Sequence, residues 1–223
     1  MNVSDAIKGR KSVRAFLDKA VSRKTVEAIL DTARWAPSGV NTQPWKVFVL
    51  TGEKKAALQQ RILERFQSGE KGAMDYQYYP EAWAEPYSGR RRQCGIDLYG
   101  ALGIKREDKQ RRMDQWVANY RTFDAPVMLM FTMDAHMETG SYLDYGMFLQ
   151  SVMLAAMDND LTTCPQAALA EYPNVVREFL GLDESQLVLC GMALGYEDTD
   201  APVNNYRTVR EEVAGFTVIF WEG

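Results

Sequence analysis

Apolar residues recur at helical spacing in several stretches of the chain. In the clearest stretch, Val26, Ile29, Leu30 and Ala33 lie at i, i+3, i+4 and i+7 and so share one face of a helix. Ser22 precedes this stretch and predicts the start of the helix, because its hydroxyl can accept a hydrogen bond from the first turn. Less regular patterns with caps and stop signals predict further helices over Ser4–Gly9, Glu53–Phe66, Arg106–Tyr120, Ser141–Met157 and Pro173–Leu180.

Short apolar runs predict strands between these helices. Leu187–Leu194 is almost entirely apolar, which predicts a central strand that is covered on both faces. Trp45–Leu50, Val127–Met133 and Phe216–Trp221 are predicted as further strands, whereas Leu161–Gln166 is predicted as a loop. Because strands and helices do not alternate strictly, the pattern favours an α+β fold in which helices flank a sheet.

Two segments interrupt the pattern. Ala36–Pro44 holds two prolines and a glycine, which interrupt a helix and predict a loop. Tyr76–Arg92 mixes aromatic residues with prolines and three consecutive arginines, and it has no clear periodicity. We interpret this segment as part of a long excursion from one core rather than as a second domain. The prediction is a single domain over residues 1–223 with an excursion or lid at about 70–120.

Composition and charge narrow the classes of protein. Hydrophobic residues make up 46% and charged residues 25% of the 223 positions, an ordinary globular balance. The net charge of −4 argues against nucleic-acid binding over the whole surface, and the apolar runs are too short to cross a membrane. Three cysteines argue against a disulfide framework. Together with the lack of a signal-peptide pattern at Met1–Asp5, these features predict a cytoplasmic location.

The reactive residues of the chain point to chemistry supplied by a cofactor. A single histidine, His136, argues against a metal site and against a Ser-His-Asp triad. Cys164 has no histidine near it in the sequence and is not predicted to be a nucleophile. No G-x-G-x-x-G fingerprint follows a predicted strand, so a Rossmann dinucleotide site is not supported. If the chain is an enzyme, a bound cofactor therefore performs the reaction.

Two polar segments are candidates for holding a cofactor. Arg10–Arg14 places three cations and a hydroxyl within five residues, a set that can bind the oxygens of a phosphate. A solvated basic turn would have the same composition. Ala36–Trp45 presents small donors and acceptors that suit the edge of a planar heterocycle. The same side chains would also suit a connection that satisfies its own backbone.

Taken in order, short motifs over nearly the whole chain resemble the FMN-binding pattern of the nitroreductase family. They are R-K-S-x-R-x-F at Arg10–Phe16, A-P-S-x-x-N-x-Q-P-W at Ala36–Trp45, D-A-P at Asp124–Pro126, T-C-P-Q at Thr163–Gln166, and G-Y at Gly195–Tyr196 followed by Arg207. One departure is the turn before T-C-P, where the family often has glycines and this chain has Asn159–Thr162. Asn and Asp tolerate left-handed conformations, so the turn can be kept.

The resemblance implies an intertwined homodimer around a central, mostly antiparallel sheet, with non-covalent FMN at sites on the subunit interface. It implies phosphate and ribityl contacts from Arg10, Lys11, Ser12 and Arg207, and a contact from Arg14 to the N1–C2=O edge of the ring. The ring would be lined by Pro165, Gln166 and Ala167, and the partner subunit would supply Pro37, Ser38, Gly39, Asn41 and Gln43. The aromatic side chains expected to contact substrate are Tyr76, Tyr79, Trp83, Tyr87 and Tyr120. An ordinary surface helix-loop with partly buried rings is the alternative for the stretch Tyr76–Tyr87.

The implied reaction moves electrons from NADH or NADPH to FMN, and then to a nitroaromatic, quinone or similar electron-poor acceptor in a ping-pong mechanism. No side-chain nucleophile is needed, and Arg14 would stabilise the anionic reduced flavin. The alternatives are another flavin reaction on the same fold, such as reductive dehalogenation, enoate reduction or flavin fragmentation, and a non-catalytic flavin carrier. A third alternative, an interaction domain without a cofactor, is disfavoured because it does not explain why these motifs occur together in this order.

Overall fold

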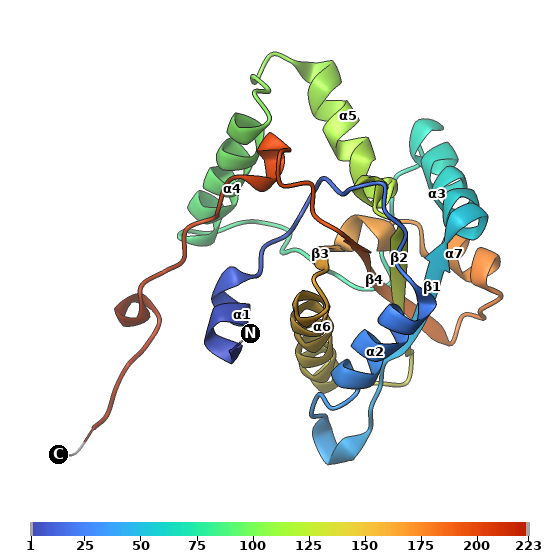
Figure 1. Cartoon of the computed structure of the whole chain (residues 1–223), viewed down its shortest axis with the longest axis horizontal. Helices are drawn as coiled ribbons and strands as arrows, with labels where there is room; N and C mark the ends of the chain where they lie inside the picture. The colour runs from blue at the N-terminus through green and yellow to red at the C-terminus, as the bar shows by residue number, and fades with distance from the viewer. Residues whose placement is uncertain (1, 222–223) are drawn as a thin grey trace.

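The computed structural model of the chain describes residues 2–221. Helices pack on both faces of a four-stranded sheet (Figure 1). The helices are α1 (Val3–Gly9), α2 (Arg23–Ala33), α3 (Gly52–Gln67), α4 (Tyr87–Ala101), α5 (Lys109–Tyr120), α6 (Gly140–Asp158) and α7 (Pro173–Leu180). The strands are β1 (Lys46–Thr51), β2 (Val127–Asp134), β3 (Thr162–Gln166) and β4 (Gln186–Gly195). Their order is β1-β2-β4-β3 with every pair antiparallel, which confirms the predicted α+β fold and its antiparallel sheet.

Strand β2 lies in the middle of three layers. Successive side chains of a strand point to opposite faces of the sheet. Val127, Leu129 and Phe131 accordingly share a buried cluster with residues of α2 and α6, while Met128 and Met130 share another with residues of α3 and α7. This two-sided burial explains why five consecutive residues of β2, Val127–Phe131, are apolar. Strand β4 is likewise an interior strand, as its apolar run predicted.

A β-bulge joins the sheet to the segment that precedes α4. The register of β2 with β4 shifts after Phe131, and Leu189 has no register partner there. The Leu189 carbonyl accepts a hydrogen bond from the Tyr76 hydroxyl at 2.7 Å. The N–H of Val188 donates to Oδ2 of Asp75 at 2.8 Å. Two hydrogen bonds therefore attach the beginning of the excursion to adjacent residues of β4.

The ends of several helices were predicted correctly, but two N-caps were wrong. Ser22 Oγ accepts a backbone hydrogen bond at 3.0 Å at the start of α2, and Gly181, with φ of 67°, ends α7. Asn2, not Ser4, caps α1 by accepting a backbone hydrogen bond at 2.9 Å. Helix α6 begins one residue before Ser141, which therefore lies inside the helix. Asn and Ser are similarly good caps, so residue type alone did not choose between neighbouring candidates.

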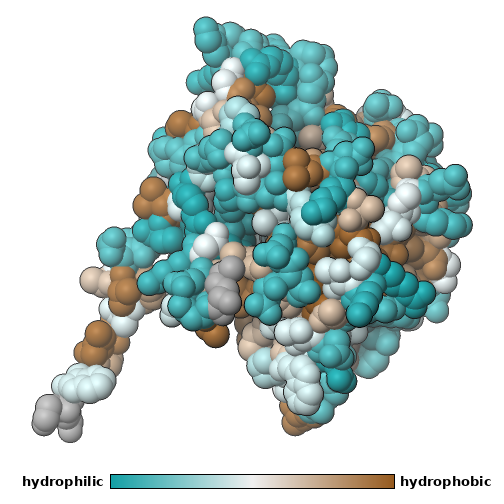
Figure 2. Space-filling model, in the orientation of Figure 1, coloured by the Kyte–Doolittle hydropathy of each residue, from teal (hydrophilic) through white to brown (hydrophobic). Residues whose placement is uncertain are grey.

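Two strand predictions were also wrong. Thr162–Gln166 is strand β3, paired with β4, although Leu161–Gln166 was predicted as a loop. A proline fits an edge strand, where an N–H is not needed on the outer side. Phe216–Trp221 forms no strand in this single chain and projects away from the body of the molecule (Figures 1 and 2). A strand requires a neighbouring strand, and none lies beside this segment within the chain.

Helices α4 and α5 protrude beyond the sheet (Figure 1). Helix α4 has no buried residue, and Tyr120 is the buried residue of α5. Without a buried face, α4 has no apolar stripe, which is why Tyr87–Arg92 was not predicted as helix. Helix α5 begins at Lys109, three residues later than predicted. In the part of the chain that the structure describes, no helix is both long and apolar enough to cross a membrane.

Candidate functional site

The cation-rich segment Arg10–Arg14 is held against the edge of the sheet. Ser12 forms a parallel bridge with Thr163 of β3, and the N–H of Val13 donates to the Thr163 carbonyl at 3.0 Å. Val13 is completely buried. The segment therefore extends β3 sideways, and its backbone is fixed although its sequence is strongly charged.

The phosphate-side residues that the sequence predicted converge on one cavity of about 180 Å³. This cation cavity is lined by Arg10, Lys11, Ser12, Arg14 and Arg207, together with Cys94, Val203, Asn204, Tyr206, Thr208 and Arg210. Sequence reasoning did not select Arg210, although it belongs to the same basic stretch as Arg207. In this cavity wall the arginines outnumber every other residue type, and no carboxylate side chain lines it.

The charges around the cation cavity are only partly compensated. Burial lowers the pKa of Arg10, and the neighbouring guanidinium groups of Arg210 and Arg207 lower it further. Lys11 is different, because its ammonium group lies 2.7 Å from the Glu197 carboxylate. Arg207 donates to the Gly9 carbonyl at 2.6 Å, but a carbonyl carries no net charge, so this hydrogen bond leaves the positive charge of the guanidinium in place. These cations repel one another, and a bound anion such as the phosphate of FMN would relieve that repulsion.

Asn204 fixes the backbone of the cation-rich segment from the other side. Its Oδ1 accepts the N–H of Arg14 at 2.8 Å, and its Nδ2 donates to the carbonyls of Ala15 and Asp198, each at 2.8 Å. The residue is 2% exposed, so each of these bonds is shielded from water. The sequence offered no signal to choose Asn204 over the adjacent Asn205, because burial alone distinguishes them.

The ring-side residues Pro165, Gln166 and Ala167 follow at the end of β3. They line a second cavity of about 340 Å³, the ring cavity, together with Tyr76, Tyr78, Tyr142, Tyr145, Gly146, Leu149, Leu189 and Cys190. Two residues of a strand span about 7 Å, so Thr163 beside the cation segment and Pro165 beside the ring cavity are within reach of one extended ligand. The cation cavity and the ring cavity thus lie one after the other along β3, as the phosphate and the ring lie at the two ends of FMN.

Gln166 carries an unpaired polar atom at this position. Its side-chain Nε2 donates to the Asn119 carbonyl at 2.8 Å, and its Oε1 has no hydrogen-bond partner among residues 2–221. Buried acceptors are rarely left without a donor. An N–H group of a bound ligand would satisfy this one, so the ring cavity also fits a polar heterocycle.

The loop Pro37–Gln43 lies apart from both cavities within the single chain. Val40, Asn41 and Gln43 have positive φ angles of 44°, 59° and 49°, although none is a glycine. The Ser38 hydroxyl accepts the Gln43 N–H at 3.0 Å, and the Gly39 N–H donates to Asp144 of α6 at 3.2 Å. Val40 is 99% exposed. The chain thus holds an unusual loop shape beside α6 and leaves the outer surface of the loop in water.

Three of the five predicted substrate residues belong to one chain of aromatic contacts. It begins at the ring cavity, where Tyr142 and Tyr76 lie 5.2 Å apart between ring centroids. From Tyr76 it continues to Tyr78 at 6.1 Å, to Tyr79 at 4.6 Å and to Trp83 at 5.5 Å. Aromatic neighbours at these distances support one another and offer a surface on which flat molecules stack.

The other two predicted substrate residues lie elsewhere. Tyr87 begins α4 and is 59% exposed, with the Arg90 guanidinium 5.8 Å from its ring centroid. Tyr120 is completely buried and lines a third cavity of about 670 Å³. Its hydroxyl donates to Oε2 of Glu171 at 2.5 Å, and burial raises the pKa of this phenol. The structure therefore divides the predicted set among three places.

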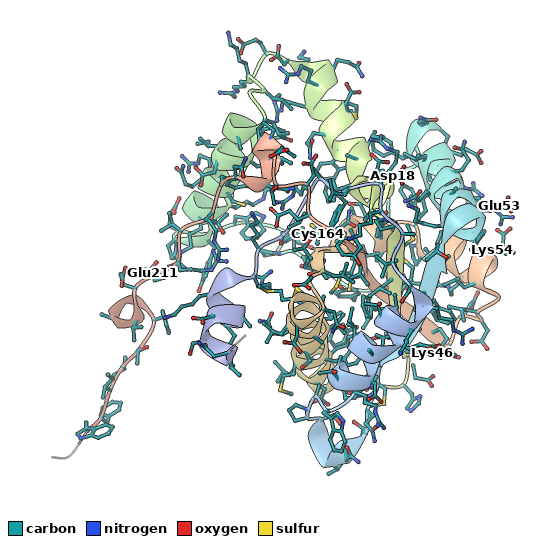
Figure 3. The ribbon with its side chains drawn as sticks, in the orientation of Figure 1. Asp18, Lys46, Glu53, Lys54, Cys164 and Glu211 are labelled. Carbon is teal, nitrogen blue, oxygen red and sulfur yellow. The ribbon has the colours of Figure 1, made fainter. Side chains whose placement is uncertain are left out.

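Cys164 is unsuited to act as a nucleophile. It lies in the middle of the molecule on β3 (Figure 3), and it is 2% exposed. Burial raises the pKa of its thiol to about 11, so the reactive thiolate is scarce at neutral pH. This agrees with the expectation that a cofactor, and not a side chain, performs the reaction.

Comparison with known proteins identifies the family of this arrangement. A profile of the nitroreductase family matches residues 7–196. The 4-nitrobenzoate reductase of Pseudomonas putida is 42% identical over 211 residues, which cover 95% of this chain and 92% of that protein. The nitrobenzene nitroreductase of Ectopseudomonas oleovorans is 38% identical over 221 residues, which cover 99% of this chain and 97% of that protein.

A solved structure agrees in fold over the full length. The FMN- and NADPH-dependent nitroreductase NfnB from Sphingopyxis sp. strain HMH superimposes with a TM-score of 0.95, at 40% identity and with 100% of both chains covered. The motifs that carry the cation cavity, the ring cavity and the loop beside α6 thus occur in a chain whose whole fold matches. This chain belongs to the nitroreductase family.

Proposed function

We propose that this protein is an FMN-dependent oxidoreductase that uses NADH or NADPH to reduce nitroaromatic or similar electron-poor acceptors. The observation that carries the proposal is the cation cavity, in which Arg10, Arg207 and Arg210 face one space that no carboxylate lines. Family membership supports the same conclusion, and the relatives described above are named for the reduction of nitro compounds. Three free cysteines suit a reducing compartment, so we place the protein in the cytoplasm.

The residues of the two cavities would divide the work of binding FMN. Arg10, Arg207 and Arg210 would hold the phosphate, since guanidinium groups pair well with phosphate oxygens. Arg14 is held by the Tyr206 hydroxyl and the Ser12 carbonyl, each at 3.3 Å, and would place a cation at the edge of the ring. The cofactor supplies a ring that accepts a hydride from the nicotinamide and passes electrons to the acceptor.

The aromatic chain from Tyr142 to Trp83 would shape the space above the ring. Tyr76 is fixed by its hydrogen bond to the bulge in β4, whereas Tyr79 is 58% exposed. A flat acceptor would stack on these rings and exclude water from the reacting face. Because donor and acceptor would use the same face in turn, we expect ping-pong kinetics.

We further propose a homodimer whose sites include residues of both copies. Apolar side chains are exposed on α6, where Leu143 is 75% exposed, and at the end of the projecting segment, where Phe220 is 94% and Trp221 is 85% exposed. Strand β1 is an edge strand with an open outer side, which suits the addition of a strand from a partner. In such a dimer the loop Pro37–Gln43 of one copy would reach the FMN of the other.

The first test is an anaerobic absorption spectrum of the purified protein before and after NADPH is added. Oxidised-flavin bands that bleach on addition are expected for a nicotinamide-reducible flavoenzyme. Bands that persist would instead indicate a flavin carrier or a different electron donor. A colourless protein that does not bind added FMN would overturn the proposal.

The dimer is tested by sedimentation velocity on the Phe220→Ala/Trp221→Ala double variant. If the projecting segment covers a partner, the dimer of the double variant is expected to have a higher dissociation constant than the wild-type dimer. The variant is also expected to bind FMN less tightly. Ile96→Ala, which removes an exposed apolar side chain from α4, serves as the matched control. A wild type that sediments as a monomer at all concentrations would contradict the dimer.

A further inference from the structure

The third cavity, of about 670 Å³, lies between the end of α3, helix α5 and the residues after β3. Five of its thirteen lining residues are aromatic, namely Phe66, Tyr99, Trp116, Tyr120 and Tyr172. Tyr120 and Tyr172 are buried and form the floor, whereas Trp116 is 45% exposed. The Trp116 indole N–H donates to the Tyr120 hydroxyl at 3.2 Å, which fixes the orientation of one wall. Small-molecule sites have this size and this aromatic character.

Three cations stand around this cavity. They are Lys71, Lys109 and Arg112, and none of them lies within ion-pair distance of a carboxylate in the described part of the chain. The Arg112 guanidinium lies 5.2 Å from the centroid of the Tyr99 ring. An arginine beside an aromatic wall can hold an anion at the edge of a stacked ring.

The two acids of the cavity are already engaged. Glu70 lies 3.2 Å from the Arg65 guanidinium. Glu171 accepts the hydrogen bond of Tyr120, and burial raises the pKa of its carboxyl, so the protonated form is favoured relative to an ordinary glutamate. The cations that line the cavity therefore outnumber its acids, three to two, and both acids already have a partner.

The cavity is a neighbour of the ring cavity. Tyr120 lines the third cavity, and the carbonyl of the preceding residue, Asn119, accepts the hydrogen bond of Gln166. Gln166 in turn lines the ring cavity. Two consecutive residues at the end of α5, Asn119 and Tyr120, thus connect the walls of the two cavities, so the third cavity is a neighbour of the site proposed for FMN.

We propose that the third cavity binds a planar aromatic carboxylate, with its ring against Trp116 and Tyr99 and its carboxylate on Lys109 and Arg112. Aromatic walls favour a flat ligand, and cations without an ion-pair partner among the described residues favour an anion, so the two features together favour a benzoate-like molecule. The proposal concerns a binding site beside the one that the proposed function assigns to the acceptor. The binding of the carboxylate does not rest on the proposed function.

The test measures binding of benzoate to the FMN-loaded protein by isothermal titration calorimetry. Benzoate cannot be reduced, so the readout is independent of turnover. We expect benzoate to bind more tightly than the neutral isostere benzamide, and the Lys109→Met/Arg112→Met variant to bind benzoate roughly tenfold or more weakly while benzamide binding is unchanged. Lys105→Met, an exposed lysine just before α5 and outside the cavity, is the matched control and is expected to leave both affinities unchanged.

A second readout uses stopped-flow kinetics. In the Lys109→Met/Arg112→Met variant, the rate of flavin reduction by NADPH is expected to stay constant, because neither residue lines the cation cavity or the ring cavity. A loss of folding would change this rate together with the affinity for benzoate. A variant that binds benzoate as tightly as the wild type would overturn the site.

The outcomes separate this site from the proposed function. If benzoate does not bind but NADPH still bleaches the flavin, the site is wrong and the function stands. If benzoate binds as expected but the flavin is not reduced, the site stands and the function is wrong. Quenching of Trp116 fluorescence by iodide, taken as the difference from a Trp116→Phe variant, checks access. Complete protection in the protein without benzoate would show that a second copy covers the cavity and would overturn the site.

Discussion

The cation segment and the excursion of α4 and α5 are both rich in arginine, yet the structure treats them differently. Arg10–Arg14 is bridged to β3, contains the fully buried Val13 and is held by Asn204. Helix α4 has no buried residue and α5 has one. A segment fixed on both sides suits a cofactor that every turnover needs, whereas a weakly packed segment can change its surface without cost to the fold. We infer that cofactor affinity and acceptor choice reside in separate parts of the molecule.

Truncation of core and excursion residues gives the largest expected contrast. Phe131→Ala in β2 is expected to lower the free energy of unfolding by about 3–5 kcal/mol, because it leaves a cavity between the sheet and α6. Ile96→Ala in α4, where the side chain is 57% exposed, is expected to change it by less than about 0.5 kcal/mol. Urea denaturation of both variants measures the difference. A similar loss in both would show that the excursion is packed after all.

Next in size is the loss of FMN affinity when a guanidinium leaves the cation cavity. Arg10→Ala is expected to weaken FMN binding roughly 10- to 100-fold, since a charge-assisted hydrogen bond to phosphate is lost. Lys11→Ala is expected to have a smaller effect, because its charge is already paired with Glu197. Fluorescence titration of the apoprotein with FMN measures both. The exposed Arg23→Ala serves as control, and an equal effect of all three would indicate nonspecific electrostatics.

A variant of Asn204 tests whether a rigid backbone in Arg10–Arg14 is itself needed to bind FMN. Asn204→Ala leaves the Arg14 N–H and two carbonyls without their buried partner, at an expected cost of about 1–3 kcal/mol in unfolding free energy. FMN binding is expected to weaken as well, because Asn204 positions Arg14 through the Arg14 N–H. The neighbouring Asn205→Ala, at an exposed position, is the control. Normal FMN affinity and an unchanged flavin spectrum in a destabilised Asn204→Ala protein would restrict the residue to a structural role.

The smallest expected effect is a pH dependence in the half-buried Glu171. Burial raises the pKa of this carboxyl, so the folded state binds a proton more tightly than the unfolded state does. Between the ordinary pKa of a glutamate and the raised value, stability therefore falls as pH rises. Glu171→Gln keeps an acceptor for Tyr120 and is expected to remove this slope. Unfolding midpoints of both proteins from pH 4 to about pH 7 measure the difference, and identical slopes would contradict a raised pKa.

Hydrophobic pattern predicted the elements whose identity is decided by burial. Strands β2 and β4 are mostly apolar because both of their faces are covered, whereas α2 shows a single apolar stripe because only one of its faces is buried. The pattern gave no signal for β3, whose polar residues are stabilised by pairing at a sheet edge, or for α4, which has no face to bury. Hydrophobic periodicity arises where one face of an element is buried, so it does not predict an element that forms without a buried face.

The candidate site shows the same division. Arg10, Arg14 and Arg207 were chosen from motifs, and the structure brings them to one cavity although they are far apart in the sequence. Asn204 could not be chosen, since its role depends on which backbone atoms surround it. Nor did the sequence indicate that Tyr120 faces a different cavity from Tyr76, because the path of the chain between residues 76 and 120 follows no regular pattern.

The bulge in β4 has a practical consequence for protein engineering. Two side chains attach the segment before α4 to adjacent residues of β4, Asp75 on the Val188 N–H and Tyr76 on the Leu189 carbonyl. Both contacts use the backbone of β4 and not its side chains, so the side chains of the strand can be exchanged without losing either attachment. A segment grafted in place of residues 77–86 that keeps this Asp-Tyr pair at its beginning would therefore retain both anchors.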